Sequence, residues 1–186
     1  MGADIWTFCE VYTEEQGQKL WRPVPLKDWD DPRDYELFYI LAGVRGYDHN
    51  TYPPIAPCRG LPEDINPSTI PERYLPALGH SNAVSYYTLK ELKDSPYSRI
   101  MKLKKWVDAD EYRKWEQLTA AEQEQYGMFY SVHVDTPPYE REGLVLIERE
   151  DYYNLNYLWI IQEMEDVKRL WGIESEENVR LVFWVV

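Results

Sequence analysis

The sequence predicts a mixed α+β fold: a single domain over residues 1–186 in which helices pack on a mostly antiparallel sheet beside a long proline-rich loop. Three observations support this prediction. The chain has 186 residues, 44% of them hydrophobic, which is enough to bury one core. Short segments of strand-like residues lie at both ends of the chain, and segments with helix-capping residues lie between them.

An opening β-hairpin is predicted from the first 25 residues. Ile5, Phe8 and Val11 recur among polar residues in positions 3–12, although the alternation is imperfect. Residues 14–17 supply a turn, and residues 19–22 the second strand. Prolines at positions 23 and 25 should end the hairpin, because proline cannot donate a hydrogen bond to a sheet.

Capping residues predict several short helices. Asp34 can cap a buried helix over 35–42, which Gly43 can terminate. Thr88 and Glu91 have the spacing of a capping box and should start a helix directly after a strand over 83–87. A helix through Leu118 with Asp108 or Asp110 as its cap, and a second helix from Thr119 toward Gly127, are also expected, whereas residues 98–107 fit either a strand or a helix.

The last third of the chain should alternate strands with one long helix. Strands are predicted over 129–134 and 144–147, separated by a turn at Pro137-Pro138. An apolar stripe over 157–171 predicts a helix that Gly172 can stop. Apolar residues in 179–185 predict a closing strand.

The stretch between Arg45 and Pro76 is expected to be a long ordered loop. It has no sustained hydrophobic period, and prolines accumulate in it at positions 53, 54, 57, 62, 67, 71 and 76. Loops longer than about 12–15 residues inside compact domains are often functional. This loop is therefore the first place to search for a site.

Polar and aromatic residues in and just after the loop could form an anion site. Guanidinium groups bind phosphate with two hydrogen bonds, and tyrosine rings can stack on a base. The candidate ligand-binding residues are Arg45, Tyr47, His49, Tyr52, Arg59, His80 and Ser81. In the alternative interpretation, the arginines only satisfy the many backbone carbonyls of an irregular loop.

Charge and composition exclude several partners and place the protein in a reducing compartment. The net charge of −13 opposes binding to duplex nucleic acid and to anionic membranes, despite a basic run at Lys102, Lys104 and Lys105. The acidity indicates solubility or, alternatively, a surface that mimics nucleic acid. Cys9 and Cys58 are too few for a disulfide framework, and no segment approaches the roughly 20 apolar residues of a membrane span, so we expect a cytoplasmic protein.

No motif of an enzyme or metal protein is present in the sequence. The GxSxG elbow, glycine-rich phosphate loops and paired histidine ligands are all missing. The possible ligands Asp4, His49, His80 and His133 are scattered. We therefore predict no catalytic residues, no metal and no cofactor, and expect binding rather than catalysis.

Several segments resemble a family of uncharacterised bacteriophage proteins. They are the opening MGADI, the stretch 35–44 followed by Arg45, the stretch 54–62 with its RGLP sequence, His80-Ser81 followed by 88–92, and the aromatic C-terminal strand. The resemblance implies a small phage accessory protein in the cytoplasm of a host bacterium, and it carries no activity over to particular residues.

Three functions are compatible with these observations. The first is a phage counter-defence protein that sequesters a small nucleotide-derived immune signal without turnover. The second is an acidic protein or DNA mimic that inhibits a host enzyme, and the third is a metal-assisted phosphodiesterase. A homo-oligomer is also possible, because a valine-rich strand ending at Val186 could pair with another copy.

Overall fold

The computed structural model describes residues 4–15, 17–27, 33–45, 52–81, 83–125 and 143–186. The predicted mixed α+β class is confirmed: helices accompany two antiparallel sheets. The chain divides into two compact units, Met1–Arg99 with Asn154–Val186, and Ile100–Tyr153, and each is described separately below. The expectation of one domain over 1–186 stays a prediction.

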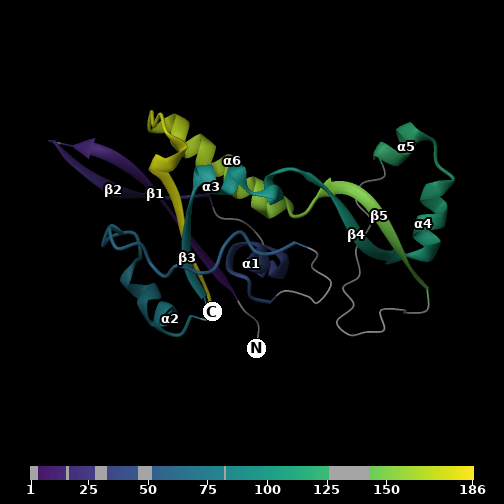
Figure 1. The fold of residues 1–186 in the computed structure, drawn as a ribbon, viewed down its shortest axis with the longest axis horizontal. Coiled ribbons are helices and arrows are strands. Elements are labelled where there is room, and N and C mark those ends of the chain that lie inside the picture. The colour runs from purple at the N-terminus through teal and green to yellow at the C-terminus, as the bar shows by residue number, and fades with distance from the viewer. Residues whose placement is uncertain (1–3, 16, 28–32, 46–51, 82, 126–142) are drawn as a thin grey trace. The chain divides into compact units, whose positions relative to one another are not determined.

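The first unit is built on a four-stranded antiparallel sheet with strand order β2-β1-β6-β3. The strands are β1 (Ile5–Glu15), β2 (Gln18–Val24), β3 (Ala83–Thr88) and β6 (Val179–Val185) (Figure 1). The predicted opening hairpin is thus confirmed as β1 and β2, although β2 continues through Pro23 to Val24 instead of ending before this proline. The N-terminal and C-terminal strands of the chain lie side by side, because β1 pairs with β6 along Ile5–Val11.

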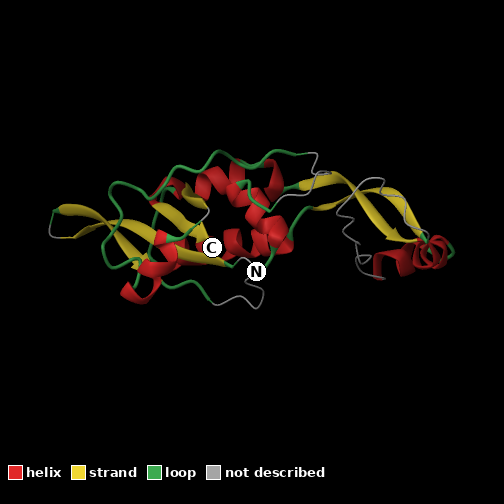
Figure 2. Cartoon of the chain, turned by 90° about the horizontal axis from the view of Figure 1, so that it is seen from below, coloured by secondary structure: helices red, strands yellow, loops and turns green. Residues whose placement is uncertain are grey.

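One face of this sheet is covered by helices. These are α1 (Tyr35–Ala42), α3 (Leu89–Asp94) and α6 (Leu155–Leu170), which contact β3 and β6 (Figures 1 and 2). Buried side chains from both layers meet there, among them Leu41 and Ile40 of α1 and Phe183 and Leu181 of β6. The Tyr87 hydroxyl donates to the Leu41 carbonyl at 3.1 Å, which ties β3 to α1.

The caps of α1 and α3 form where the sequence predicts them. An Asp34 side-chain oxygen accepts from the Leu37 N–H at 3.0 Å, and Gly43 ends α1 with φ 68°. Thr88 and Glu91 form the predicted capping box of α3. Glycine suits the end of α1 because other residues are strained at positive φ.

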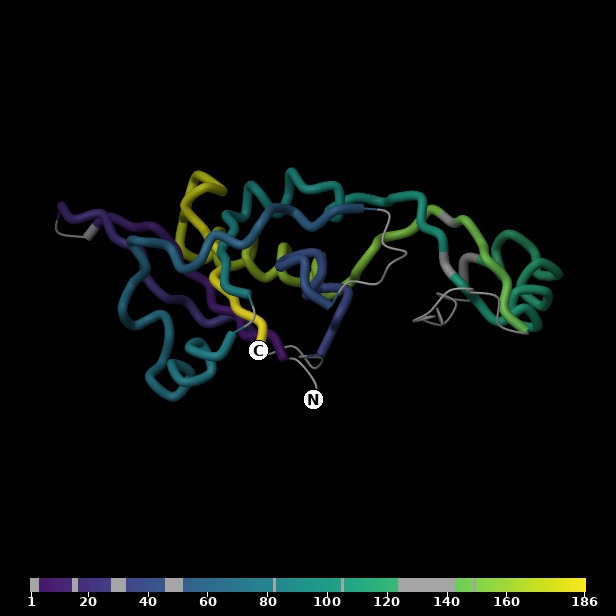
Figure 3. Tube along the Cα trace, turned by 60° about the horizontal axis from the view of Figure 1, so that its bottom comes forward, coloured from purple at the N-terminus to yellow at the C-terminus, as the bar shows by residue number. Residues whose placement is uncertain are grey.

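The opposite face of the sheet is covered by the later part of the proline-rich segment, from Asp64 to Tyr74, rather than by long helices. Residues 52–71 have no regular structure, and they lead into a 3₁₀ turn at Glu72–Tyr74 and the short helix α2 (Leu75–Gly79). Figure 3 traces this segment, in blue to teal, beside the strands. It buries Thr69 and Ile70. The chain therefore folds as three layers in this unit: helices, sheet and loop.

The predicted role of the terminal strand in oligomerisation is wrong. β6 pairs with β1 on one side and with β3 on the other, and every residue of Val179–Val185 is buried. A strand hydrogen-bonded on both sides has no free edge for a second copy. The pairing of this strand therefore no longer supports a homo-oligomer.

The second unit is a two-stranded antiparallel ribbon of β4 (Ile100–Asp108) and β5 (Leu144–Tyr152). Helices α4 (Ala109–Glu116) and α5 (Ala120–Gln125) follow β4 along the chain (Figure 1). This settles residues 98–107 as mostly strand. Lys102 and Lys104 lie opposite Glu150 and Glu148, so carboxylates flank the predicted basic run. The strand predicted over 129–134 lies outside the described residues.

None of the helices in the described ranges combines the length and the apolar character that crossing a membrane requires.

Candidate functional site

The sequence-predicted site residues near the end of α1 are only partly described. Tyr47 and His49 lie outside the described residues. Arg45 is exposed and has φ 60°, three residues after Ala42, the last residue of α1. The Tyr52 carbonyl accepts hydrogen bonds from the hydroxyls of Tyr39 (3.1 Å) and Tyr97 (3.2 Å), so Tyr52 anchors the returning loop to the core.

Arg59 is held by a carboxylate and by aromatic rings. It donates to Glu91 at 2.6 Å, and its guanidinium carbon lies 4.8 Å from the ring centroid of Tyr87 and 5.3 Å from that of Tyr86. Burial disfavours the charge on both partners, but the hydrogen bond and mutual attraction dominate: the pKa of Arg59 is raised and the pKa of Glu91 is lowered. Arg59 therefore ties the loop to Glu91, which is part of the N-terminal cap of α3.

His80 and Ser81 lie at the other end of β3. His80 follows α2 and is exposed, and the Ser81 hydroxyl donates to the Leu78 carbonyl at 2.8 Å. Arg59, in contrast, lies beside the later part of β3, where its backbone N–H donates to Ser85. The structure thus joins Arg59 with tyrosines but does not pair it with His80 or Ser81.

The main polar feature under the loop is a buried ion pair that the sequence did not reveal. Arg180 of β6 donates to Glu10 of β1 at 2.7 Å, and both side chains are at most 4% exposed. The same guanidinium donates to Asp64 in the loop at 2.7 Å and lies 3.8 Å from the ring centroid of Trp21. We call these residues, with Asn66 and Thr69, the Glu10–Arg180 network.

The loop completes the hydrogen bonding of Glu10. One carboxylate oxygen accepts from the Asn66 backbone N–H at 2.9 Å and from the Thr69 hydroxyl. Trp21 donates to Asp64 at 2.8 Å. Burial alone would raise the pKa of Asp64, but Arg180 and Trp21 lower it below the ordinary value. A buried charge is tolerated only when it is paired in this way, so the network fixes the loop on the sheet.

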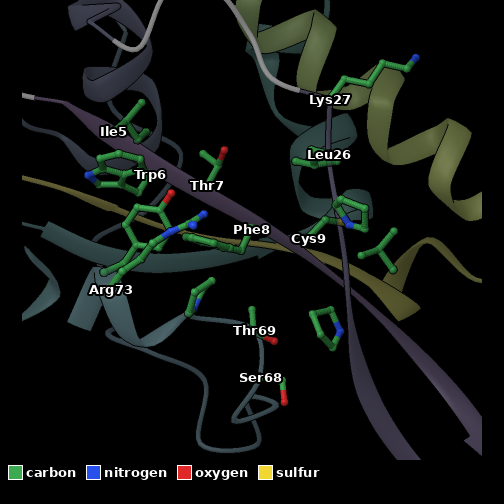
Figure 4. A pocket seen from close by; sticks show the side chains of 15 residues that line it. Ile5, Trp6, Thr7, Phe8, Cys9, Leu26, Lys27, Ser68, Thr69 and Arg73 are labelled. Atoms are coloured by element: carbon green, nitrogen blue, oxygen red, sulfur yellow. The ribbon is translucent and has the colours of Figure 1, made fainter.

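A pocket of about 470 Å³ lies between β1 and the proline-rich loop that the Glu10–Arg180 network holds on the sheet (Figure 4). It lies entirely within the first unit. Its walls come from three segments: the start of β1, the end of β2 with the residues that follow it, and the loop before α2. The lining residues span 5–9, 23–27 and 68–74, with Ile70 and Glu72 left out. Pockets of a few hundred Å³ are the usual size for small ligands.

The pocket combines aromatic rings with one cation. Trp6 and Phe8 lie on the loop-facing side of β1, and the Tyr74 ring centroid is 4.6 Å from that of Trp6 and 5.7 Å from that of Phe8. The Arg73 guanidinium stacks on Tyr74 at 4.8 Å, and no carboxylate of the described residues forms an ion pair with it. The hydroxyl of Ser68 adds a hydrogen-bonding group.

Two other lining residues are less suited to chemistry. Burial, with the nearby charge of Glu10, raises the pKa of the Cys9 thiol to about 12, so Cys9 stays protonated and unreactive at neutral pH. Lys27 donates to Glu163 of α6 at 2.9 Å and is occupied by that ion pair. Arg73 is thus the pocket cation without a carboxylate partner among the described residues.

Sequence reasoning missed most of this site. It pointed to the segment between Arg45 and Ser81, which does supply one wall, but it selected other residues within that segment. Trp6 and Arg73 carry no motif, and only their position in the fold brings them together. Within the described ranges, no three His, Cys, Asp or Glu side chains gather closely enough to hold a metal ion.

No protein-family model matches this chain, and neither does a curated protein or a solved structure. The site is therefore interpreted from its own geometry.

Proposed function

We propose that the pocket between β1 and the loop binds a small phosphorylated, nucleotide-derived ligand. The proposal depends on the position of Arg73. This cation lies on a pocket wall and has no carboxylate partner among the described residues. The rings of Tyr74 and Trp6 lie beside it in the same pocket. Arginine is suited to phosphate and aromatic rings to a base. In an acidic protein, such a cation favours a small anion over a polyanion.

The proposed role is sequestration without turnover. The pocket's thiol is protonated and its lysine is already paired, so its lining offers a better fit to binding than to nucleophilic chemistry. Together with the resemblance to phage proteins, this leads us to propose a counter-defence protein that removes a nucleotide-derived immune signal from the bacterial cytoplasm.

Isothermal titration of the full chain with AMP, cyclic AMP and ADP-ribose tests the proposal. At least one of these probes should bind, and Arg73→Gln should weaken that binding about 10- to 100-fold, because a charged hydrogen bond contributes roughly 1.5–3 kcal/mol. Arg169→Gln is the matched control: Arg169 is an exposed arginine of the same unit that pairs with Asp166, outside the pocket lining. It should leave the affinity unchanged.

Two outcomes would contradict the proposal. One is that none of the three probes binds. The other is that Arg73→Gln and Arg169→Gln bind equally well. Release of a hydrolysis product from a bound probe would contradict the absence of turnover while leaving the ligand class intact.

A further inference from the structure

The inner wall of the pocket is a strand edge that lacks a neighbour. β2 pairs with β1 from Cys9 to Glu15, whereas β6 pairs with β1 from Ile5 to Val11. The first four residues of β1, Ile5–Phe8, therefore have β6 on one side and no described strand on the other. The same four residues line the pocket.

The register identifies which backbone groups point to the open side. Asp4 and Val186 exchange two hydrogen bonds, of 3.2 and 3.0 Å. In an antiparallel pair, hydrogen-bonded residues alternate with residues that face away, so Trp6 and Phe8 bond to β6. The N–H and C=O groups of Ile5 and Thr7 therefore point to the other edge of β1, where β2 no longer pairs with it. No described residue outside the sheet forms a backbone hydrogen bond with either of them.

We infer that the backbone of Thr7 recognises the hydrogen-bonding edge of a purine base. One residue of a strand edge offers an N–H donor and a C=O acceptor side by side. Adenine presents the complement, a ring nitrogen that accepts next to an amino group that donates. The pair is therefore suited to a purine nucleotide, with the base on the strand edge. This inference rests on the proposed function and names the ligand class of the same pocket.

The other walls agree with this placement. Side chains alternate along a strand, so Trp6 and Phe8 face the loop while Thr7 faces the helix side. Tyr74 belongs to the loop wall and lies beside Trp6 and Phe8. Arg73 of the same wall lies near these side chains of β1 as well (Figure 4). A base held at the Thr7 backbone can thus lie against aromatic side chains while its phosphate reaches Arg73.

A planar base fits this edge better than an extended peptide does. Strand addition depends on a row of main-chain hydrogen bonds, and strands usually have three or more residues. Only Ile5 and Thr7 present outward groups here, because β2 occupies the edge from Cys9 onward. A short edge of this kind offers too few bonds for a stable added strand.

Modified ligands test the inference on the unaltered protein. AMP should bind at least tenfold more tightly than N6,N6-dimethyl-AMP, whose amino group can no longer donate to the Thr7 carbonyl. Ribose 5-phosphate, which keeps the phosphate but has no base, should bind more weakly than both. Equal binding of AMP and the dimethyl compound would overturn the inference.

A pair of variants adds a test from the protein side. Thr7→Pro removes the outward N–H but no hydrogen bond of the β1–β6 ladder, whereas Thr7→Val keeps that N–H and removes only the hydroxyl. Thr7→Pro should weaken AMP binding at least tenfold, and Thr7→Val should not. Thermal unfolding of both variants checks that the sheet is intact.

The failures can be told apart. If AMP and N6,N6-dimethyl-AMP bind equally well through Arg73, or if Thr7→Pro binds AMP as well as Thr7→Val, the purine-edge inference is wrong and the proposed function stands. If no nucleotide binds, both are wrong.

Discussion

The two faces of the four-stranded sheet are buried in different ways. The face that carries Phe183 and Leu181 is covered by helices and is held by apolar side chains. The face that carries Arg180 is covered by the proline-rich loop and is held by a buried ion pair with its hydrogen bonds. One cover is a set of regular elements, and the other is a chain with few backbone hydrogen bonds of its own.

This difference explains how an irregular loop can form the wall of a site. Apolar contacts are not directional, so they would hold such a loop without fixing its course. The Glu10–Arg180 network instead holds defined atoms of Asp64, Asn66 and Thr69. Arg73 and Tyr74 follow Thr69 by four and five positions, so the network positions this wall of the pocket. Four predictions test this contrast.

The largest effect is expected for Arg180→Met, which leaves Glu10 buried without its cation. Removing one partner of a buried pair typically costs about 3–5 kcal/mol of unfolding free energy, because the remaining charge is uncompensated. Urea denaturation measures the change. Arg169→Met, which removes an exposed arginine paired with Asp166, is the control and should change stability little.

The double variant Glu10→Gln/Arg180→Met sharpens this test. Without the buried charge, it should be more stable than Arg180→Met alone. A cost below about 1 kcal/mol for Arg180→Met would show that the loop is held by other contacts.

On the helix face, Leu41→Ala should cost about 2–4 kcal/mol, because Leu41 is fully buried and its removal leaves a cavity. The two faces should differ in where the damage appears. Amide exchange at Asn66 should accelerate in Arg180→Met by more than the loss of global stability explains, whereas in Leu41→Ala it should follow global stability alone. The same local acceleration in both variants would contradict the contrast between the faces.

A smaller loss, about 1–2 kcal/mol, is expected for Thr69→Val. The hydroxyl that donates to Glu10 is removed, while Arg180 and Asn66 still bind that carboxylate. Chemical denaturation measures the loss. The control Ser68→Ala alters the exposed neighbouring hydroxyl and should have almost no effect on stability. If both variants lose equally, the Thr69 hydrogen bond has no special importance.

The sequence predicts the helix face far better than the loop face. Asp34, Gly43 and the Thr88–Glu91 box determine their local structure, and a capping residue acts within three or four positions of itself. The hairpin and the long helix α6 are also local patterns. The apolar alternation in β6 identifies a strand, but it does not say that both of its edges are paired.

The candidate site depends on contacts between distant positions, which local patterns do not encode. Glu10 and Arg180 are 170 positions apart, and each looks like an ordinary surface charge in the sequence. The sequence predicts an anion-binding role for Arg59, but its guanidinium pairs with Glu91. The sequence pattern identifies Glu91 as a capping-box residue without indicating this partner. Only the strand order brings these partners together, and strand order is not a local property.

The smallest effect is a pH dependence at Asp64, on the rim of the network. Its pKa is lower in the folded protein than in the unfolded chain, so its ionised form stabilises the fold at pH values above about 4, and this contribution is lost as the pH falls through the lowered pKa. Asp64→Asn should therefore be less stable than the unaltered protein at pH 7 but nearly equal to it at about pH 2.

The difference at pH 7 should stay below about 1 kcal/mol, because the Asp64 side chain is 65% exposed and solvent screens its attraction to Arg180. Thermal unfolding of both proteins across this pH range measures it. The control Glu63→Gln changes the exposed neighbouring residue. Its stability relative to the unaltered protein should not change between pH 7 and about pH 2 in the way expected for Asp64→Asn. A stability difference for Asp64→Asn that persists unchanged at low pH would assign the effect to the hydrogen bond from Trp21 rather than to charge. The loop would then be fixed by hydrogen-bond geometry at its rim and by charge only at its buried centre.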